Sequence, residues 1–397
     1  MLFTRDLRLA DHPALAAACR SGPVVPLFVL DPAIVRRAAP NRTRFLLESL
    51  ADLRDGLRRR GGELVVRRGA TVAEAMAVAR AVGAAEVVVS ADVSAFAQRR
   101  EADLAAACAA AGMGFRAFPG VTVVPPGDLL PTGGGGHFRV FTPYWRRWSA
   151  APWRPPCAAP RRVVVPDGVD AGRIPTLREL VRELERELVR RPVSPDVVPG
   201  GERAGRDRLN AYLREGPQSV WETSRLSAYL RFGCVSPLEA AVRAGDRGHD
   251  EFVRQLCWRD FFHQVTADVP SVRTADYRPQ RARAWRTDPG ALQAWAEGRT
   301  GVPLVDAGMR QLRHEGWMPG RARMVAASYL TKALGIDWRA GAAHFDAWLV
   351  DGDVACNYGN WQWVAGTGND TRPNRVLNPV VQARRFDPGG RYVAAWT

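Results

Sequence analysis

The stretch Asp351–Trp363 reads D-G-D-V-A-C-N-Y-G-N-W-Q-W and places acidic, amide and aromatic side chains close together. Buried carboxylates need partners, so Asp351 and Asp353 do not fit a simple core helix. A surface loop accounts for the Asp, Gly and Asn residues but not for Trp361 and Trp363. A polar pocket with aromatic walls, suited to a large planar ligand, accounts for both groups.

Length and composition predict an ordinary globular protein of two domains. The chain has 397 residues, of which 46% are hydrophobic and 24% are charged. Its six Cys and six His show neither disulfide-frame nor metal-ligand spacing, so no metal site is expected. No long apolar run and no signal-peptide pattern are present, which predicts a cytoplasmic protein without membrane contact.

The charge balance points to a polyanionic partner. The formal net charge is +15 and the pI is about 10.6. Such an excess of Arg favours binding to phosphates, because binding releases counterions. An arginine-rich composition without any such partner gives the same numbers, and composition alone does not separate the two.

The first 122 residues alternate strand-like with helix-like runs. We expect strands at 24–30, 63–67 and 86–90, and helices at 42–60, 72–82 and 96–111. This alternation predicts an α/β domain with a doubly wound parallel sheet. Ligands bind such sheets at the carboxyl ends of the strands, so that edge is the expected place for a second, smaller ligand.

Residues 123–200 are rich in Pro and Gly and are interpreted as an interdomain linker. The glycine run Gly133–Gly136 lacks a following Gly-Lys-Ser/Thr, which indicates a flexible loop instead of a phosphate-binding loop. The charged segment 176–191 predicts a solvated helix within this linker.

Residues 201–397 predict an all-α domain. Helices are expected at 204–214, 237–244, 251–266, 290–297, 305–315, 321–334 and 340–349. Asp306, Asp337 and Asp351 fit as cap, first-turn or loop residues. Ten of the thirteen Trp lie beyond residue 220, so the aromatic chemistry belongs to this domain.

Several spaced motifs carry a family resemblance. They are F-T-R-D-L-R from Phe3, T-S-R-L-S from Thr223, Y-L-R-F-G from Tyr229, W-R-D-F-F from Trp258, V-D-A-G-M-R-Q-L from Val305, E-G-W-M from Glu315, R-A-R-M from Arg321 and the opening stretch. In this order and spacing the sequence resembles the photolyase/cryptochrome family of flavin-dependent blue-light proteins. The resemblance covers nearly the whole chain.

The resemblance implies FAD in a bent form inside the helical domain. The residues that it assigns to FAD are Thr223, Ser224, Arg225, Leu226, Ser227, Arg259, Arg323, Asp351, Gly352, Asp353 and Asn357. Hydroxyl and backbone N–H groups at 223–227 suit a pyrophosphate, although an ordinary helix cap has the same pattern. Arg259 and Arg323 fit either a ligand or structural ion pairs. Asn357 matches the residue beside flavin N5, which is Asn in photolyases and often Asp or Cys in cryptochromes.

The resemblance also implies a redox relay. Trp361, Trp338 and Trp285 match the family's electron-transfer chain, ordered from the flavin to the surface. Each Trp alone also fits core packing, but the match of all three favours a relay that photoreduces the flavin. Together with Asn357 and Gln255, these residues form the predicted catalytic set.

UV-damaged DNA is the implied partner. Photolyases are among the base-flipping enzymes, and Trp258 and Trp363 match the aromatic pair that flanks a flipped pyrimidine dimer. Met324 matches a position near the base of that pocket, with Gln255 and Arg259 as the other predicted DNA contacts. Arg and Lys around the rim are expected to follow phosphates.

Four features depart from the family pattern. Gln255 stands where enzymes that repair cyclobutane dimers usually have Glu; Gln is usual in (6-4) photolyases and animal cryptochromes. Pro319 and Gly320 replace a His-Asn or His-His pair, so the His that (6-4) repair is thought to need is missing. The family's tyrosine contact to FAD, upstream of Thr223, has no clear counterpart, and Met1 lies almost inside the first strand.

We therefore predict a deoxyribodipyrimidine photo-lyase, which repairs cyclobutane pyrimidine dimers by electron transfer from excited reduced FAD. The alternative is a cryptochrome-like FAD photoreceptor without repair, with a (6-4) photolyase less favoured. Phe96 and Ala97 do not support a folate antenna, so a deazaflavin, a flavin or an empty site remain open. A monomer without an obligate protein partner is expected.

Overall fold

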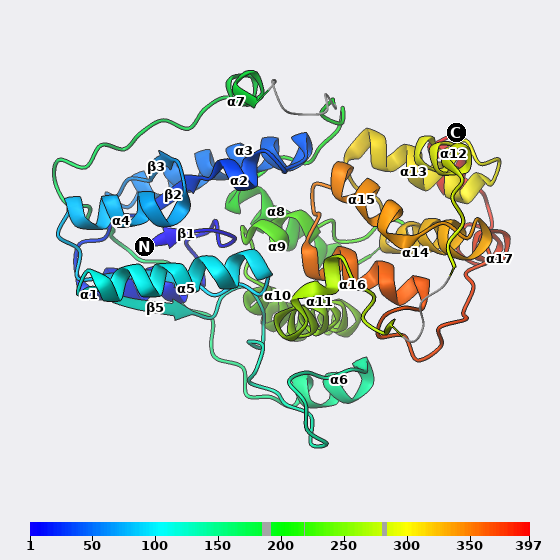
Figure 1. Ribbon diagram of the computed structural model, residues 1–397, viewed down its shortest axis with the longest axis horizontal. Helices are drawn as coiled ribbons and strands as arrows, with labels where there is room; N and C mark the ends of the chain where they lie inside the picture. The colour runs from blue at the N-terminus through cyan, green and yellow to red at the C-terminus, as the bar shows by residue number, and fades with distance from the viewer. Residues whose placement is uncertain (185–191, 218, 280–283) are drawn as a thin grey trace.

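The computed structural model describes residues 1–184, 192–217, 219–279 and 284–397. An α/β region occupies the left of Figure 1 and holds the N-terminus, and a helical region on the right holds the C-terminus. Among the described residues, no helix is both long and apolar enough to cross a membrane.

A five-stranded parallel sheet forms the α/β region, in the order β3-β2-β1-β4-β5. The strands are β1 (Leu2–Phe3), β2 (Leu27–Leu30), β3 (Val65–Arg68), β4 (Glu86–Ser90) and β5 (Gly114–Phe118). The predicted parallel sheet is confirmed. We did not predict β5, because this edge strand is half-exposed and mixes Gly and Arg with its two Phe residues.

Helices cover both faces of the sheet. They are α1 (Pro13–Ser21), α2 (Pro32–Val35), α3 (Pro40–Arg58), α4 (Thr71–Ala81) and α5 (Ala95–Ala110). Phe28 and Leu30 pack in the same core as side chains of α1 and α3, whereas Leu27 and Val29 pack with side chains of α4 and α5. Since successive strand residues point to opposite faces, the alternation confirms the doubly wound arrangement.

The predicted linker is tied to the helical region at a buried carboxylate. It contains α6 (Phe141–Ser149) and α7 (Leu177–Leu184), while residues 185–191 of the expected charged helix lie outside the described residues. Asp260 Oδ2 accepts the indole N–H of Trp148 at 2.9 Å and the backbone N–H groups of Val123 and Val124 at 2.9 and 3.0 Å. The aspartate of the W-R-D-F-F motif therefore anchors this segment. The domain limits at residues 122 and 200 stay predictions.

The second half of the chain is helical. Its α-helices are α8 (Glu202–Glu215), α9 (Ser227–Phe232), α10 (Pro237–Gly245), α11 (Asp250–Asp268), α12 (Pro289–Glu297), α13 (Pro303–Glu315), α14 (Gly320–Ser328), α15 (Trp338–Trp348), α16 (Val354–Ala365), α17 (Pro379–Phe386) and α18 (Arg391–Ala395). Every predicted helix of this half has a counterpart. The segment predicted at 321–334 divides into α14 and a π-helical turn at Tyr329–Ala333.

The opening stretch forms helix α16, which the sequence did not predict. Asp353 is its N-cap, with Oδ1 accepting the backbone N–H of Cys356 at 2.8 Å. The carboxylates therefore lie before the helix, not inside it. Asp337 caps α15 and Asp306 lies in the first turn of α13, in agreement with expectation.

Two glycines let α16 lie close to its neighbours. A Cβ on Gly341 of α15 would lie 2.2 Å from the ring of Trp361, and a Cβ on Gly359 would lie 2.3 Å from the ring of Phe262 in α11. Real Cβ atoms do not approach heavy atoms this closely. Glycine at both positions therefore fixes how deeply Trp361 and α16 sit between α11 and α15.

Candidate functional site

A cavity of about 780 Å³ in the helical half collects most of the predicted site. The predicted residues in its wall are Thr223, Ser224, Arg225, Leu226, Ser227, Gln255, Arg259, Arg323, Met324, Asp351, Gly352, Asp353, Asn357 and Trp361. These residues come from the segment that leads into α9, from α11 and α14, from the segment before α16 and from α16 itself. Trp258, Trp285, Trp338 and Trp363 do not line it.

Both carboxylates of the opening stretch already have protein partners. Asp351 forms a two-pronged pair with Arg323, at 3.0 Å from Nη1 to Oδ1 and 2.7 Å from Nη2 to Oδ2. Asp353 uses Oδ1 for the α16 cap and Oδ2 for an ion pair with Arg5. Burial alone would raise the pKa of Asp353, but the nearby charges, above all Arg5, hold it well below its usual range. Each carboxylate oxygen keeps a second lone pair for a ligand.

Arg5, in the N-terminal motif F-T-R-D-L-R, pairs with two carboxylates. It follows β1, and Asp92 follows the neighbouring strand β4, so both lie where the strand order of the sheet reverses. The guanidinium contacts Asp92 Oδ1 at 3.1 Å and Asp353 with its other nitrogen. Parallel sheets usually bind ligands in this crevice. Here the crevice docks helix α16 against the sheet.

Arg231 lines the cavity and forms no ion pair among the described residues. In the sequence it stood out only as part of the Y-L-R-F-G motif. Its Nε donates to the Gly352 carbonyl at 3.1 Å. Burial, with further repulsion from Arg5 and Arg42, lowers its pKa to about 9. A cationic wall of this kind favours an anionic ligand such as a diphosphate. Apart from the motif, no sequence signal marked this role.

The segment 223–227 does not act as an ordinary serine or threonine cap. Leu226 occupies the N-cap of α9 and makes no side-chain cap bond. Arg225 has a φ of 51°, pairs with Glu315 at 3.0 Å and lies 4.6 Å above the ring of Trp317. The helix-cap interpretation of this segment is therefore wrong, and its groups face the cavity.

Tyr212 of α8 also lines the cavity. The sequence offered no clear tyrosine counterpart upstream of Thr223, because the intervening stretch is short. The structure places Tyr212 of α8 in the cavity lining together with Thr223, and the sequence statement on the FAD contact stays as it was made. Its ring packs against His249 and Phe252.

The predicted redox residues lie in α16 (Asn357 and Trp361), in α15 (Trp338) and before α12 (Trp285). Asn357 donates from Nδ2 to the Ala342 carbonyl at 3.1 Å, which fixes the amide plane. Trp361 is buried against Trp295 and Phe345, with ring centroids at 6.0 and 4.9 Å. Trp338 is fully buried in α15, and Trp285 is partly buried just after residues 280–283, which lie outside the described part. The relay itself stays a prediction.

The cavity mouth carries Gln255, which is exposed and donates to Glu251 Oε1 at 2.7 Å. Nearby, Trp258 and Trp363 meet nearly at right angles with ring centroids 6.5 Å apart. The ring of Phe141 of α6 stacks on the ring of Trp258, with the two centroids 3.6 Å apart. The sequence did not indicate this contact. The predicted aromatic pair is thus brought together outside the cavity lining.

His263, Asp353 and Cys356 form a cluster with metal-ligand spacing, their ligand atoms within 4.8 Å of one another. Asp353 Oδ2 pairs with the Arg5 guanidinium. A metal cation there would meet that fixed positive charge, so the cluster offers a poor cation site.

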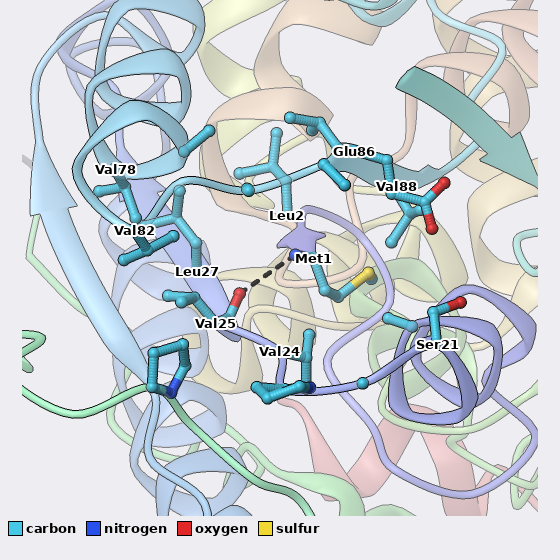
Figure 2. Close-up of a pocket in the computed structure, with 18 of the residues that line it drawn as sticks. Met1, Leu2, Ser21, Val24, Val25, Leu27, Val78, Val82, Glu86 and Val88 are labelled. Atoms are coloured by element: carbon cyan, nitrogen blue, oxygen red, sulfur yellow. Dashed lines mark hydrogen bonds between the residues drawn. The ribbon is translucent and has the colours of Figure 1, made fainter. Parts of the chain in front are cut away.

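A second cavity, of about 650 Å³, lies in the α/β region (Figure 2). Its labelled lining is mostly apolar and includes Leu2, Leu27, Val78 and Val88. It opens at the amino ends of the strands, on the edge opposite the Arg5 crevice. The antenna prediction is not tested by this geometry.

Known proteins are similar to this chain along its whole length. The family model described as DNA photolyase matches residues 1–161, and that of the FAD binding domain of DNA photolyase matches residues 252–397. A deoxyribodipyrimidine photo-lyase of Streptomyces griseus is 52% identical, covering 100% of this chain and 88% of that protein. A cryptochrome DASH of Natronomonas pharaonis is 35% identical over 99% of this chain and 88% of that protein. The crystal structure of a class III photolyase from Agrobacterium tumefaciens has a TM-score of 0.89 at 31% identity, covering 100% of this chain and 85% of that one.

The buried His263 predicts an acid-sensitive core. Burial, followed by repulsion from Arg259, lowers its pKa to about 4, against 6.5 for an unperturbed histidine. Between these values the unfolded chain binds a proton that the folded chain excludes, so the free energy of unfolding falls as pH falls from 6.5 to 4. The slope from this group is at most ~1.4 kcal/mol per pH unit.

Urea unfolding of the native protein and of His263→Asn at several pH values measures this slope. Asn retains an amide that can donate to the Arg259 carbonyl, as His263 Nδ1 does at 2.8 Å. We expect a shallower loss of stability in the variant below pH 6.5. Asp260, whose pKa burial raises to about 6, acts in the opposite sense in both proteins. Parallel curves would contradict the assignment.

Proposed function

The chain belongs to the DNA photolyase and cryptochrome family, and on this premise we propose that it is a deoxyribodipyrimidine photo-lyase. It uses blue light to split cyclobutane pyrimidine dimers in DNA. One observation carries the proposal: the cationic wall, Asn357 and the buried Trp361 all line the same cavity. The relative with 52% identity over the whole chain bears the same name.

The cavity fits FAD by the chemistry of its wall. Arg231 needs an anion, and Thr223 and Ser224 add hydroxyl groups on the same wall, which suits a diphosphate. Asp351 and Asp353 are held by arginines yet keep free lone pairs for N–H and O–H groups. When bound, reduced FAD supplies the light-excited electron that opens the cyclobutane ring.

The chain's own residues position and insulate the cofactor site. Asn357, held by the Ala342 carbonyl, presents a neutral amide to the cavity. A neutral group accepts or donates a hydrogen bond there without adding a fixed charge. Trp361 adds a buried indole to the same wall as the first member of the proposed relay.

The cavity mouth suits a flipped pyrimidine dimer. Gln255 and Met324 line the cavity, and Trp258 and Trp363 provide aromatic faces beside Gln255. A damaged pair of bases stacks poorly, so flipping it costs less than flipping sound bases. The net charge of +15 supports affinity for the phosphates around the lesion. We propose that the protein acts on this DNA in the cytoplasm as a single chain.

A photoreceptor without repair is the second candidate. Gln255 favours it, because an amide cannot give a proton to the dimer as a carboxylic acid can. Gly320, one of the two residues that replace the family's usual pair, lines the cavity. The missing His at Pro319 argues against (6-4) repair in particular.

A defined oligonucleotide with one cyclobutane thymine dimer separates the two functions. Purified, photoreduced protein is illuminated with blue light, and recovery of thymine absorbance is followed against a dark control. We expect light-dependent recovery. Photoreduction of the flavin without any recovery, on this dimer and on a (6-4) lesion, would favour the photoreceptor instead.

Replacing Arg231 by Met tests the cationic wall. Met retains much of the aliphatic volume but removes the charge, and charged hydrogen bonds contribute ~1.5–3 kcal/mol. We therefore expect FAD affinity, measured by titration of flavin fluorescence, to fall at least about tenfold. Arg206→Met is the matched control, since Arg206 of α8 is half-exposed and pairs with Glu239. Equal affinities in the two variants would show that Arg231 does not hold the anion.

A further inference from the structure

Trp338, the proposed middle member of the relay, is fully buried and has a charged hydrogen-bond partner. Its Nε1–H donates to Asp276 Oδ1 at 2.8 Å. The Asp276 side chain is itself only 10% exposed. A largely buried carboxylate therefore faces the one atom of this ring that carries an acidic proton.

Three charged groups surround the ring, and they sum to one negative charge. Arg339 lies 4.7 Å above the Trp338 ring and contacts Asp276 Oδ1 at 2.9 Å. Its other terminal nitrogen is 3.1 Å from both carboxylate oxygens of Asp337. Two carboxylates thus compensate one guanidinium, which leaves the surroundings of Trp338 attractive to a positive charge.

Trp361 has different surroundings. It packs against the rings of Trp295 and Phe345. None of the hydrogen bonds found among the described residues involves its indole N–H. A positive charge on Trp361 would lie in an apolar environment, where an unpaired charge is costly. A charge that moves from Trp361 to Trp338 would gain a carboxylate partner.

We propose that Asp276 is a positioning residue of the electron relay and holds the electron hole on Trp338. This inference rests on the proposed function, which assigns the relay to Trp361, Trp338 and Trp285. Trp338 gives one electron to oxidised Trp361 and becomes a radical cation, and Trp361 is restored. The proton then moves from Trp338 Nε1 to Asp276 Oδ1, which leaves a neutral Trp338 radical and a neutral carboxylic acid. When Trp285 later gives an electron to this radical, the proton returns from Asp276 to Nε1, so Trp338 is restored and the hole passes to Trp285.

The proton transfer has a clear physical reason. Loss of an electron makes the indole N–H a far stronger acid, and its acceptor is already at hydrogen-bond distance. Before transfer, the same contact is a charge-assisted bond between a cationic donor and a carboxylate. Either form lowers the free energy of oxidised Trp338 relative to oxidised Trp361, so back-transfer becomes slow.

Flash photolysis of the FAD-loaded Trp285→Phe protein, in which the relay ends at Trp338, tests the role of Asp276 when it is read as tryptophan-radical absorbance. In Asp276→Asn the amide oxygen still accepts the N–H but neither carries charge nor takes the proton. We expect the neutral-radical band to be replaced by the radical-cation band. We also expect charge recombination to become at least about tenfold faster, because the charged hydrogen bond is lost.

Two further variants give matched controls. Asp337→Asn removes the other carboxylate partner of Arg339, keeps a capping side chain and leaves the indole N–H bond to Asp276 intact, so the neutral-radical band is expected to remain, with a smaller change in lifetime than in Asp276→Asn. Arg339→Gln removes the cation above the ring, so a longer-lived radical is expected. FAD loading and the unfolding midpoint of each variant show that it has folded.

The outcomes separate this inference from the proposed function. If Trp338→Phe fails to slow flavin photoreduction, the relay is wrong and this inference falls with it. If Trp338→Phe slows photoreduction while Asp276→Asn keeps the native radical band and lifetime, only the role of Asp276 is overturned. Should Asp276→Asn not fold, Trp285→Phe in D₂O decides: slower formation of the neutral Trp338 radical supports the proton transfer, and an unchanged rate overturns it.

Discussion

The ion pair between Arg5 and Asp353 joins two parts of the chain that are 348 residues apart. Arg5 lies at the carboxyl end of β1, and Asp353 is the cap that starts α16. A buried carboxylate without its partner is strongly destabilising, so the two groups must meet if either is to be buried. The cavity wall formed by α16 is therefore complete only when the sheet and the helical region have docked.

This constraint orders the rest of the site. The cap sets where α16 begins, and the helix then brings Asn357 and Trp361 to the cavity at intervals of one turn. Gly341 and Gly359 let the helix approach its neighbours closely enough to bury Trp361. The walls are thus held by protein contacts, while the mouth, with the exposed Gln255, is left for the substrate.

Much of the fold could be predicted because it depends on local pattern. The apolar strands and the amphipathic helices gave the doubly wound sheet and the helical half. Strand β5 was not predicted because it is an edge strand, which buries too little side-chain surface to need a run of apolar residues. Helix α16 was not predicted because its polar and aromatic residues line a cavity and do not repeat with a helical period.

The candidate site was predictable as a set of residues but not as a set of contacts. Asp351 and Asp353 were recognised, yet the sequence does not show that one pairs with Arg323 and the other with Arg5. Arg231 was missed because its place in the cavity wall depends on which side chains come together after folding. Ion pairs between distant residues leave no trace in a single sequence.

The coupling free energy between Arg5 and Asp353 tests the account most directly. It is obtained from the FAD-binding free energies of the native protein, Arg5→Met, Asp353→Asn and the double variant. If the pair builds the cavity, Arg5→Met leaves Asp353 without its arginine, and Asp353→Asn leaves Arg5 with Asp92 alone. The double variant then loses less affinity than the two singles together, by ~1–3 kcal/mol. Additive losses would contradict the account, because Arg5 and Asp353 would then act on the cavity independently.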